Sequence, residues 1–282
     1  MTETDVYQGT IEGVPYLAKP PARANEPAPV VFAWHLMDAP RTEAAFEAAL
    51  PLSGIDAWRV YLGLPMCGAR TPSGGFDEIM QLGMEDAVTN LYGPITERAV
   101  AEFAPVKEAL RDKFAFADGT IGVMGGSLGA AVAALVTADQ IATVGAAVLV
   151  SPLLQVRAVV AAMQRVYGIT YEWTAHSGEI GNTLDFVARA GDFVAAGCPP
   201  VRIVVGAEDD AEGFIEPAEK FAAAIAARYG GEPTVDLHRV EGMGHALAEE
   251  PGLDPAPQLP HAARADALAA EWFARHLRHA VS

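Results

Sequence analysis

Residues 120–129 of this chain read TIGVMGGSLG, an apolar run that leads into a turn rich in glycine. The run at 120–124 is short and continuous, which is typical of a strand buried on both faces of a sheet. The residues that follow the turn, 129–140, are almost wholly apolar and predict a helix packed between other layers. Ser127 therefore lies between a predicted buried strand and a predicted buried helix.

Ser127 is the centre of a G-x-S-x-G pattern at residues 125–129. Between a strand and a helix, this pattern is typical of a nucleophile elbow, a sharp turn that raises the serine hydroxyl above the sheet. Glycines suit positions where such a turn crowds its neighbours, and the following helix directs free backbone N–H groups at the serine. A chance serine in a glycine-rich turn is the alternative, but the strand before it and the helix after it favour the elbow.

Similar apolar runs recur on both sides of this stretch and predict further strands at residues 29–34, 57–62, 145–150, 201–205 and 234–240. Helical spacing of apolar residues lies between them, at residues 42–50, 95–114, 216–229 and 262–279. The opening residues, 6–17, alternate loosely and predict a β-hairpin. Strands that alternate with helices predict an α/β fold, a doubly wound and mostly parallel sheet with helices on both faces.

One interval, residues 155–200, is long for a simple connection between two strands. It has helical patterns at 156–167 and 182–196, with a polar and aromatic middle. Because long excursions in compact domains are usually functional, we expect a small helical cap here, with the core domain formed by residues 1–154 and 201–282. An ordinary crossover with an extra helix is the alternative.

A serine hydroxyl is a weak nucleophile, so it needs a general base within hydrogen-bond reach. The chain has seven histidines, and His245 is the best candidate because it lies in the turn GMGHA, just after the predicted strand at 234–240. Loops at the carboxyl ends of the strands are where a doubly wound sheet gathers its active site. His238 lies inside that strand, and His276 and His279 lie on the predicted terminal helix, so these three are expected to be structural or solvated.

The imidazole in turn needs a carboxylate that holds its tautomer and stabilises its protonated form. Residues 206–210 read GAEDD and directly follow the predicted strand at 201–205. Asp209 is our candidate, and the pattern does not separate it from Asp210 or Glu208; a merely solvated acidic loop is a further alternative. The chain order serine, aspartate, histidine, each after its own strand, matches the order of such a catalytic triad.

This combination resembles the α/β-hydrolase superfamily, in particular its serine esterases and prolyl-oligopeptidase-like hydrolases, over nearly the whole chain. The resemblance implies an oxyanion hole whose first donor follows a His-Gly pair after an early strand. The matching stretch is WHLMD at 34–38, in which His35 matches the family histidine and Leu36 replaces the glycine. By position the first donor is the N–H of Met37, with Leu36 as the alternative, and the second is the N–H of Leu128.

The resemblance implies hydrolysis of a carboxylic ester through an acyl-enzyme on Ser127, with a small acyl compound as the partner and with neither a metal nor an organic cofactor. An aminopeptidase, a thioesterase or a perhydrolase would use the same triad, and a non-catalytic relative that only binds a small molecule is the competing class. The candidates for substrate contacts are His35, Met66, Leu153 and Trp173, although such side chains are equally typical of a protein core.

The bulk composition argues against some classes of partner. The formal net charge is −17, so nucleic acids and anionic membranes should repel the chain. The sequence shows no uncharged apolar stretch long enough to span a bilayer and no signal-peptide pattern. Its two cysteines, Cys67 and Cys198, suit a reducing compartment, so we expect free thiols and a cytoplasmic location. The pattern does not distinguish a monomer from a homodimer.

Overall fold

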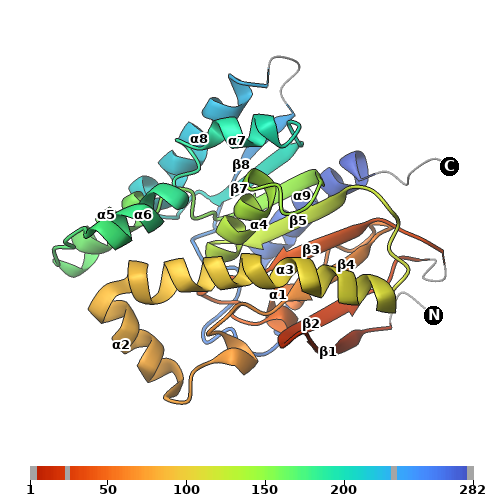
Figure 1. Ribbon diagram of the computed structural model, residues 1–282, viewed down its shortest axis with the longest axis horizontal. Coiled ribbons are helices and arrows are strands. Elements are labelled where there is room, and N and C mark those ends of the chain that lie inside the picture. Colours follow the sequence, from red (N-terminus) through yellow and green to blue (C-terminus); the bar gives the residue numbers. More distant parts are fainter. Residues whose placement is uncertain (1–4, 23–25, 230–233, 278–282) are drawn as a thin grey trace.

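Eight strands form one sheet in the computed structural model, which describes residues 5–22, 26–229 and 234–277 (Figure 1). The strands are β1 (Tyr7–Ile11), β2 (Val14–Lys19), β3 (Val30–Trp34), β4 (Trp58–Leu62), β5 (Ile121–Gly126), β6 (Val144–Val150), β7 (Val201–Gly206) and β8 (Val235–Val240). Their spatial order is β1-β2-β4-β3-β5-β6-β7-β8. The predicted opening hairpin corresponds to β1 and β2, which pair antiparallel.

The sheet is parallel from β4 to β8, and only the pairs β1/β2 and β2/β4 are antiparallel. From β3 the chain moves outward to β4 and then returns to β5 on the other side of β3. This reversal brings the loops that follow β3 and β5 together at one edge of the sheet, the place where doubly wound sheets bind ligands. The predicted fold class, a mostly parallel α/β sheet flanked by helices, is confirmed.

Helices cover both faces of the sheet (Figure 1). One face packs against α1 (Glu43–Ala49) and α9 (Pro260–His276), and the other against α3 (Gly93–Lys113), α4 (Leu128–Ala138) and α8 (Glu216–Ala226). Successive residues of the buried strands alternate between the two cores: Val123 packs on the α4 side, and Met124 on the α9 side. Both faces are therefore apolar, which explains why the strands read as continuous apolar runs.

The interval 155–200 forms three helices, α5 (Val156–Tyr167), α6 (Ala175–Thr183) and α7 (Ala190–Ala195). The prediction of one helix at 182–196 is wrong, because residues 184–189 are not helical. The backbone N–H of Phe186 donates to the carbonyl of Leu154, and the Phe186 side chain is fully buried. The core thus anchors the chain at this point and interrupts the helix. The division into core domain and cap stays a prediction.

Several elements have no counterpart among the predicted ones, among them the 3-10 helix η1 (Gly68–Arg70), α2 (Gly75–Ala87) and the π-helix η2 (Val88–Tyr92). Large apolar side chains of α2 are exposed, namely Phe76, Met80 and Met84. The apolar residues at 76, 79, 80, 84 and 87 nevertheless recur at helical spacing, so the sequence carries a signal for α2 that our prediction did not use. Figure 1 shows α2 projecting from the end of α3 at the side of the molecule where α5 and α6 also lie.

Three remaining expectations concern the termini, the cysteines and the membrane. The predicted terminal helix is α9, which ends at His276, and His279 lies outside the described residues. Cys67 and Cys198 are free thiols. Within the ranges that the structure describes, no helix combines the length and the apolar character needed to cross a membrane.

Candidate active site

Ser127 lies between β5 and α4, at the turn where the strand ends and the helix begins. Its φ of 48° and ψ of −114° place it in a region of the backbone map that non-glycine residues rarely adopt. A Cβ atom on Gly125 would lie 2.1 Å from the carbonyl oxygen of Gly129, and a Cβ atom on Gly129 would lie 2.3 Å from that of Trp34. Only glycine fits at these two positions, so the local sequence holds the serine in its strained turn.

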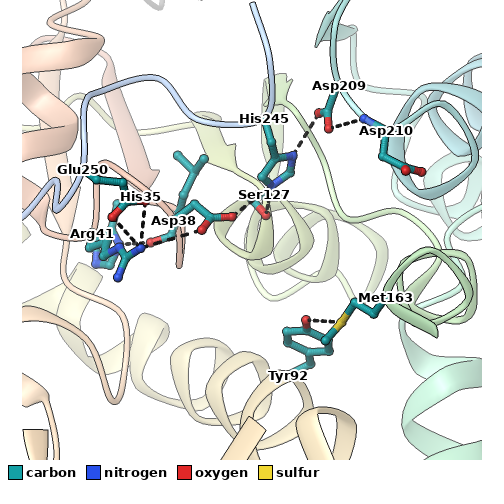
Figure 2. Close-up of polar contacts among 11 residues, drawn as sticks. His35, Asp38, Arg41, Tyr92, Ser127, Met163, Asp209, Asp210, His245 and Glu250 are labelled. Carbon is teal, nitrogen blue, oxygen red and sulfur yellow. Dashed lines mark hydrogen bonds and ion pairs between the residues drawn. The ribbon is translucent and has the colours of Figure 1, made fainter. Parts of the chain in front are cut away.

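His245 reaches Ser127 from the loop after β8, and its Nε2 lies 2.8 Å from the serine Oγ (Figure 2). The backbone of this loop passes close to the end of β7, since a Cβ atom on Gly206 would lie 2.2 Å from the carbonyl oxygen of Met243. The Phe214 ring packs against the imidazole, with the ring centroids 4.0 Å apart. Glycine at position 206 therefore lets the histidine loop approach the sheet, and Phe214 restrains the ring.

Asp209 follows β7 and faces the other ring nitrogen of His245. Its Oδ2 lies 2.9 Å from Nδ1 of His245, and its Oδ1 accepts the backbone N–H of Asp210 at 2.7 Å. The Asp209 side chain is 2% exposed, so the carboxylate is held next to the imidazole and away from water. With Nδ1–H donating to Asp209, Nε2 is left to accept the proton of Ser127. The structure thus brings together the three residues of the predicted triad.

The two neighbouring carboxylates of the acidic turn are engaged elsewhere. Asp210 caps the π-helix η3 (Ala211–Ile215) by accepting the N–H of Gly213 at 2.7 Å, and its Oδ2 lies 2.7 Å from Nη2 of Arg165 on α5. Burial opposes ionisation of Asp210, but these contacts outweigh it and hold its pKa below the usual value. Glu208 is exposed. Geometry therefore separates Asp209 from the alternatives that the sequence pattern left open.

The predicted oxyanion donors lie on the two loops next to the serine. Leu128 is the first residue of α4, so its N–H precedes the hydrogen-bonded turns of that helix. Leu36 is fully buried, and a Cβ atom on Gly126 would lie 2.3 Å from its Cδ1. The leucine that replaces the family glycine therefore packs over the backbone of the elbow. The assignment of the N–H groups of Leu128 and Met37, or Leu36, to an oxyanion hole stays a prediction.

His35 is placed differently from the substrate contact that we predicted. Its side chain is buried, its Nδ1–H donates to the carbonyl of Leu36 at 2.6 Å, and its Nε2 accepts the N–H of Leu64 at 3.0 Å. Burial, with a smaller contribution from the charge of Arg70, lowers the pKa of His35 to about 4, although the bond to Leu36 opposes this shift. The imidazole is therefore neutral, and its two hydrogen bonds connect the loop after β3 with the loop after β4.

The other predicted substrate contacts also have structural partners. Leu153 is 2% exposed and belongs to the apolar core, although its backbone N–H donates to the carbonyl of Ser127 at 3.2 Å. The guanidinium carbon of Arg157 lies over the Trp173 ring, 4.3 Å from the centroid of that ring. Met66 is half-buried. Burial of its side chain excludes Leu153 from direct contact with a substrate in this conformation, whereas the roles of Met66 and Trp173 stay predictions.

Asp38 and Tyr92 were not among the predicted site residues, although Asp38 lies beside the relay formed by Ser127, His245 and Asp209 and its charge acts on Tyr92. Asp38 places its Oδ2 3.9 Å from Nε2 of His245 and is 54% exposed (Figure 2). Tyr92, the last residue of η2, donates its hydroxyl to the sulfur of Met163 on α5 at 3.4 Å. Burial, aided by the charge of Asp38, raises the pKa of Tyr92 to about 12, so the phenol is neutral. Asp38 directly follows the predicted first oxyanion donor, a signal that could have identified it.

Comparison with known proteins identifies relatives by structure and not by sequence. No protein-family model and no curated protein matches the chain. Carboxyl esterase 2 from the mycorrhizal fungus Tuber melanosporum matches with a TM-score of 0.61 and 16% identity, covering 99% of this chain and 88% of the esterase. Dienelactone hydrolase from Anabaena variabilis matches with a TM-score of 0.58 and 15% identity, covering 98% of this chain and 100% of the hydrolase.

A puromycin-hydrolyzing peptidase from Mycobacterium tuberculosis matches with a TM-score of 0.64 and 16% identity; the match covers 96% of this chain but only 39% of the peptidase. All three structures share the layered parallel sheet described above, at identities that establish architecture and not activity. The predicted architecture is confirmed at that level, and this chain has the α/β-hydrolase fold.

Proposed function

We propose that this chain is a serine hydrolase that cleaves a carboxylic ester through an acyl-enzyme on Ser127. The observation that carries the proposal is the continuous relay from Ser127 Oγ to His245 Nε2 (2.8 Å) and from His245 Nδ1 to Asp209 Oδ2 (2.9 Å). These distances suit proton transfer without rearrangement. A non-catalytic relative would have no need of a buried carboxylate that orients an imidazole toward a strained serine, so the relay favours an enzyme.

In the proposed first half-reaction, Ser127 Oγ attacks the ester carbonyl while Nε2 of His245 accepts the hydroxyl proton. Asp209 stabilises the imidazolium that forms, because its carboxylate accepts the Nδ1–H in a water-poor position. The N–H groups of Leu128 and Met37 are the proposed donors to the oxyanion; removing one such donor typically costs about 10²–10³ in turnover. His245 then returns the proton to the alcohol oxygen, and the alcohol leaves.

In the second half-reaction, water attacks the acyl-enzyme. His245 accepts a proton from this water and later donates it to Ser127 Oγ, which releases the carboxylic acid and restores the relay. The sum of both halves is ester plus water giving acid plus alcohol. The described residues supply each proton transfer, and the proposed chemistry requires neither metal nor organic cofactor.

An ester is proposed over an amide because an alcohol oxygen needs less protonation than an amide nitrogen in order to leave. The comparisons support the general class and not this choice, since the similar structures include an esterase and a peptidase. A peptidase, a thioesterase and a perhydrolase are the alternatives that use the same relay. A small acyl compound as substrate and a cytoplasmic location complete the proposal.

The test is covalent labelling with a fluorophosphonate probe. Wild type should be labelled, Ser127→Ala should not, and Ser53→Ala should be labelled like wild type because Ser53 is an exposed loop residue. A 4-nitrophenyl ester should also give a burst of nitrophenol equal to the labelled fraction of enzyme, as expected for an acyl-enzyme. A folded wild-type protein that neither reacts with the probe nor releases nitrophenol would refute the proposal.

A further inference from the structure

Asp38 presents an acidic group directly beside the catalytic relay. Its Oδ2 lies 3.9 Å from Nε2 of His245, and its Oδ1 lies 3.8 Å from Nη2 of Arg41. Both distances exceed hydrogen-bond range, so neither His245 nor Arg41 forms a hydrogen bond with the Asp38 carboxylate. The side chain is 54% exposed, and Asp38 lies on the loop that follows β3, directly after the proposed oxyanion donor Met37 in sequence.

The positive charge nearest to Asp38 is already engaged. Nη2 of Arg41 donates to both carboxylate oxygens of Glu250 at 2.9 Å, and its guanidinium lies over the Phe76 ring, 5.0 Å from the centroid. Hydrogen bonds between charged groups at 2.9 Å are stronger than an ion pair at 3.8 Å, so Arg41 is paired mainly with Glu250. Asp38, Arg41 and Glu250 therefore carry a net charge of −1 at the edge of the site.

This negative charge is unfavourable for a neutral substrate. A bound substrate displaces water from Asp38, and a negative oxyanion then develops nearby in a medium that screens charge less well. The neighbouring phenol of Tyr92 offers no compensation, because its pKa of about 12 keeps it neutral. A positive group on the substrate removes both costs, since it pairs with the exposed carboxylate and offsets the developing charge.

We propose that Asp38 forms a subsite for a cationic group, and that the preferred substrates are esters that carry a positively charged nitrogen within a few bonds of the scissile carbonyl. The inference rests on the proposed function, because Asp38 acts at the same relay. The positively charged nitrogen belongs to either the acyl part or the alcohol part of the ester, and the experiment below distinguishes these two positions. In this view Asp38 selects the substrate, whereas Ser127, His245 and Asp209 perform the chemistry.

The test compares permanently charged esters with neutral esters of the same shape. Betaine ethyl ester and ethyl 3,3-dimethylbutanoate place the difference in the acyl part, and choline propionate and 3,3-dimethylbutyl propionate place it in the alcohol part. For each pair, kcat/KM of the charged ester is divided by that of the neutral one. Intrinsic differences in reactivity between the esters cancel when this ratio is compared between variants.

Asp38→Asn should lower the ratio about tenfold in at least one pair, as expected for loss of one charge-assisted contact. Asp38→Glu should keep the ratio within about threefold of wild type, because it retains the charge. Asp112→Asn is the matched control: Asp112 is exposed on α3, and the substitution makes the same change in net charge without altering the ratio.

Two results would overturn the inference. If Asp38→Asn leaves kcat/KM of all four esters unchanged, Asp38 does not recognise a cation; if it lowers kcat/KM by the same factor for charged and neutral esters, so that the ratios stay constant, Asp38 acts on the relay itself. Fluorophosphonate labelling of each variant shows that the serine is intact and the protein folded. Absence of labelling in wild type refutes the proposed function, and the inference with it, whereas normal labelling with unchanged ratios refutes the inference alone.

Discussion

The elbow around Ser127 and the helical segment 155–200 are held by different kinds of contact. In the elbow, backbone atoms approach so closely that Gly125 and Gly129 admit no Cβ atom. The helical segment has a backbone anchor at Phe186, but side chains make many of its other contacts, such as Arg165 with Asp210 and, within the segment, Arg157 with Trp173. The position of the nucleophile is thus dictated by backbone geometry, whereas the helical segment also depends on side chains that can be exchanged one at a time.

Asp209 and Asp210 are adjacent in sequence, but Asp209 belongs to the catalytic relay and Asp210 holds the helical segment through Arg165. Asp209→Asn should lower kcat/KM about 10⁴-fold, because the amide no longer holds the imidazole in the required tautomer. Asp210→Asn should change kcat/KM less than about tenfold but destabilise the protein by about 1 kcal/mol, because it weakens the cap of η3 and the pair with Arg165. Ester kinetics and urea unfolding measure the two effects; equal kinetic losses would show that the assignment of Asp209 is wrong.

Two glycine substitutions, one in the elbow and one in the helical segment, should change the free energy of unfolding in opposite directions. Gly129→Ala should lower the free energy of unfolding by about 3 kcal/mol or more, since its Cβ meets the rigid backbone of Trp34 and His35. Gly191→Ala should raise it by about 0.5–1 kcal/mol, because Gly191 lies in α7 with no atom near the added Cβ. Thermal or urea unfolding of both variants is the measurement, and a mild effect at position 129 would contradict the rigid elbow.

Two carboxylates, the buried Asp266 on α9 and the half-buried Asp86 on α2, should show opposite dependence of stability on pH. Burial is the main cause that raises the pKa of Asp266 from 3.8 to about 6, so its contribution to stability is present below pH 4 and is lost as pH rises through 6. Asp266→Asn should therefore gain stability relative to wild type between pH 4 and pH 7, by roughly 2–3 kcal/mol. Urea unfolding across this pH range measures the gain.

Asp86, next to the helical segment, is the counterpart. Burial opposes its ionisation, but hydrogen bonds from Thr89, Val88 and the Tyr171 hydroxyl outweigh burial and lower its pKa. Its contribution is present above pH 4 and is lost as pH falls. Asp86→Asn should therefore lose stability relative to wild type at pH 7 and approach it in acid. The same sign for both variants would contradict the opposite pKa shifts of the two carboxylates.

The smallest expected effect concerns the surface of the helical segment. Arg157→Ala removes a cation–π contact with Trp173 and two hydrogen bonds, to the carbonyl of Gly178 and to Asn182 Oδ1. Because these groups are exposed, the loss should be only about 0.5–1 kcal/mol, with kcat/KM for esters unchanged. Urea unfolding and ester kinetics check both statements, and Arg157→Lys, which keeps the charge but loses the planar contact, is the matched control.

The accuracy of the sequence predictions follows the same division. The elbow, the parallel sheet and the loop that carries His245 have strong local signals, because glycine patterns and continuous apolar runs report backbone constraints within a few residues. The predicted helix at 182–196 is wrong because Phe186 is anchored in the core, a contact that no local pattern reveals. The helix α2 differs, because its apolar residues do follow helical spacing and its sequence signal was simply not used.

The amino-acid sequence alone was enough to predict an α/β sheet, a strained serine turn and the histidine that faces it, since each depends on residue types close together in sequence. The tertiary structure decided which carboxylate of GAEDD accepts a hydrogen bond from His245. It also buried His35 as a neutral side chain bonded to Leu64, and placed Asp38 beside His245. These outcomes depend on distances between side chains on separate loops, and such distances are set by how the whole sheet packs.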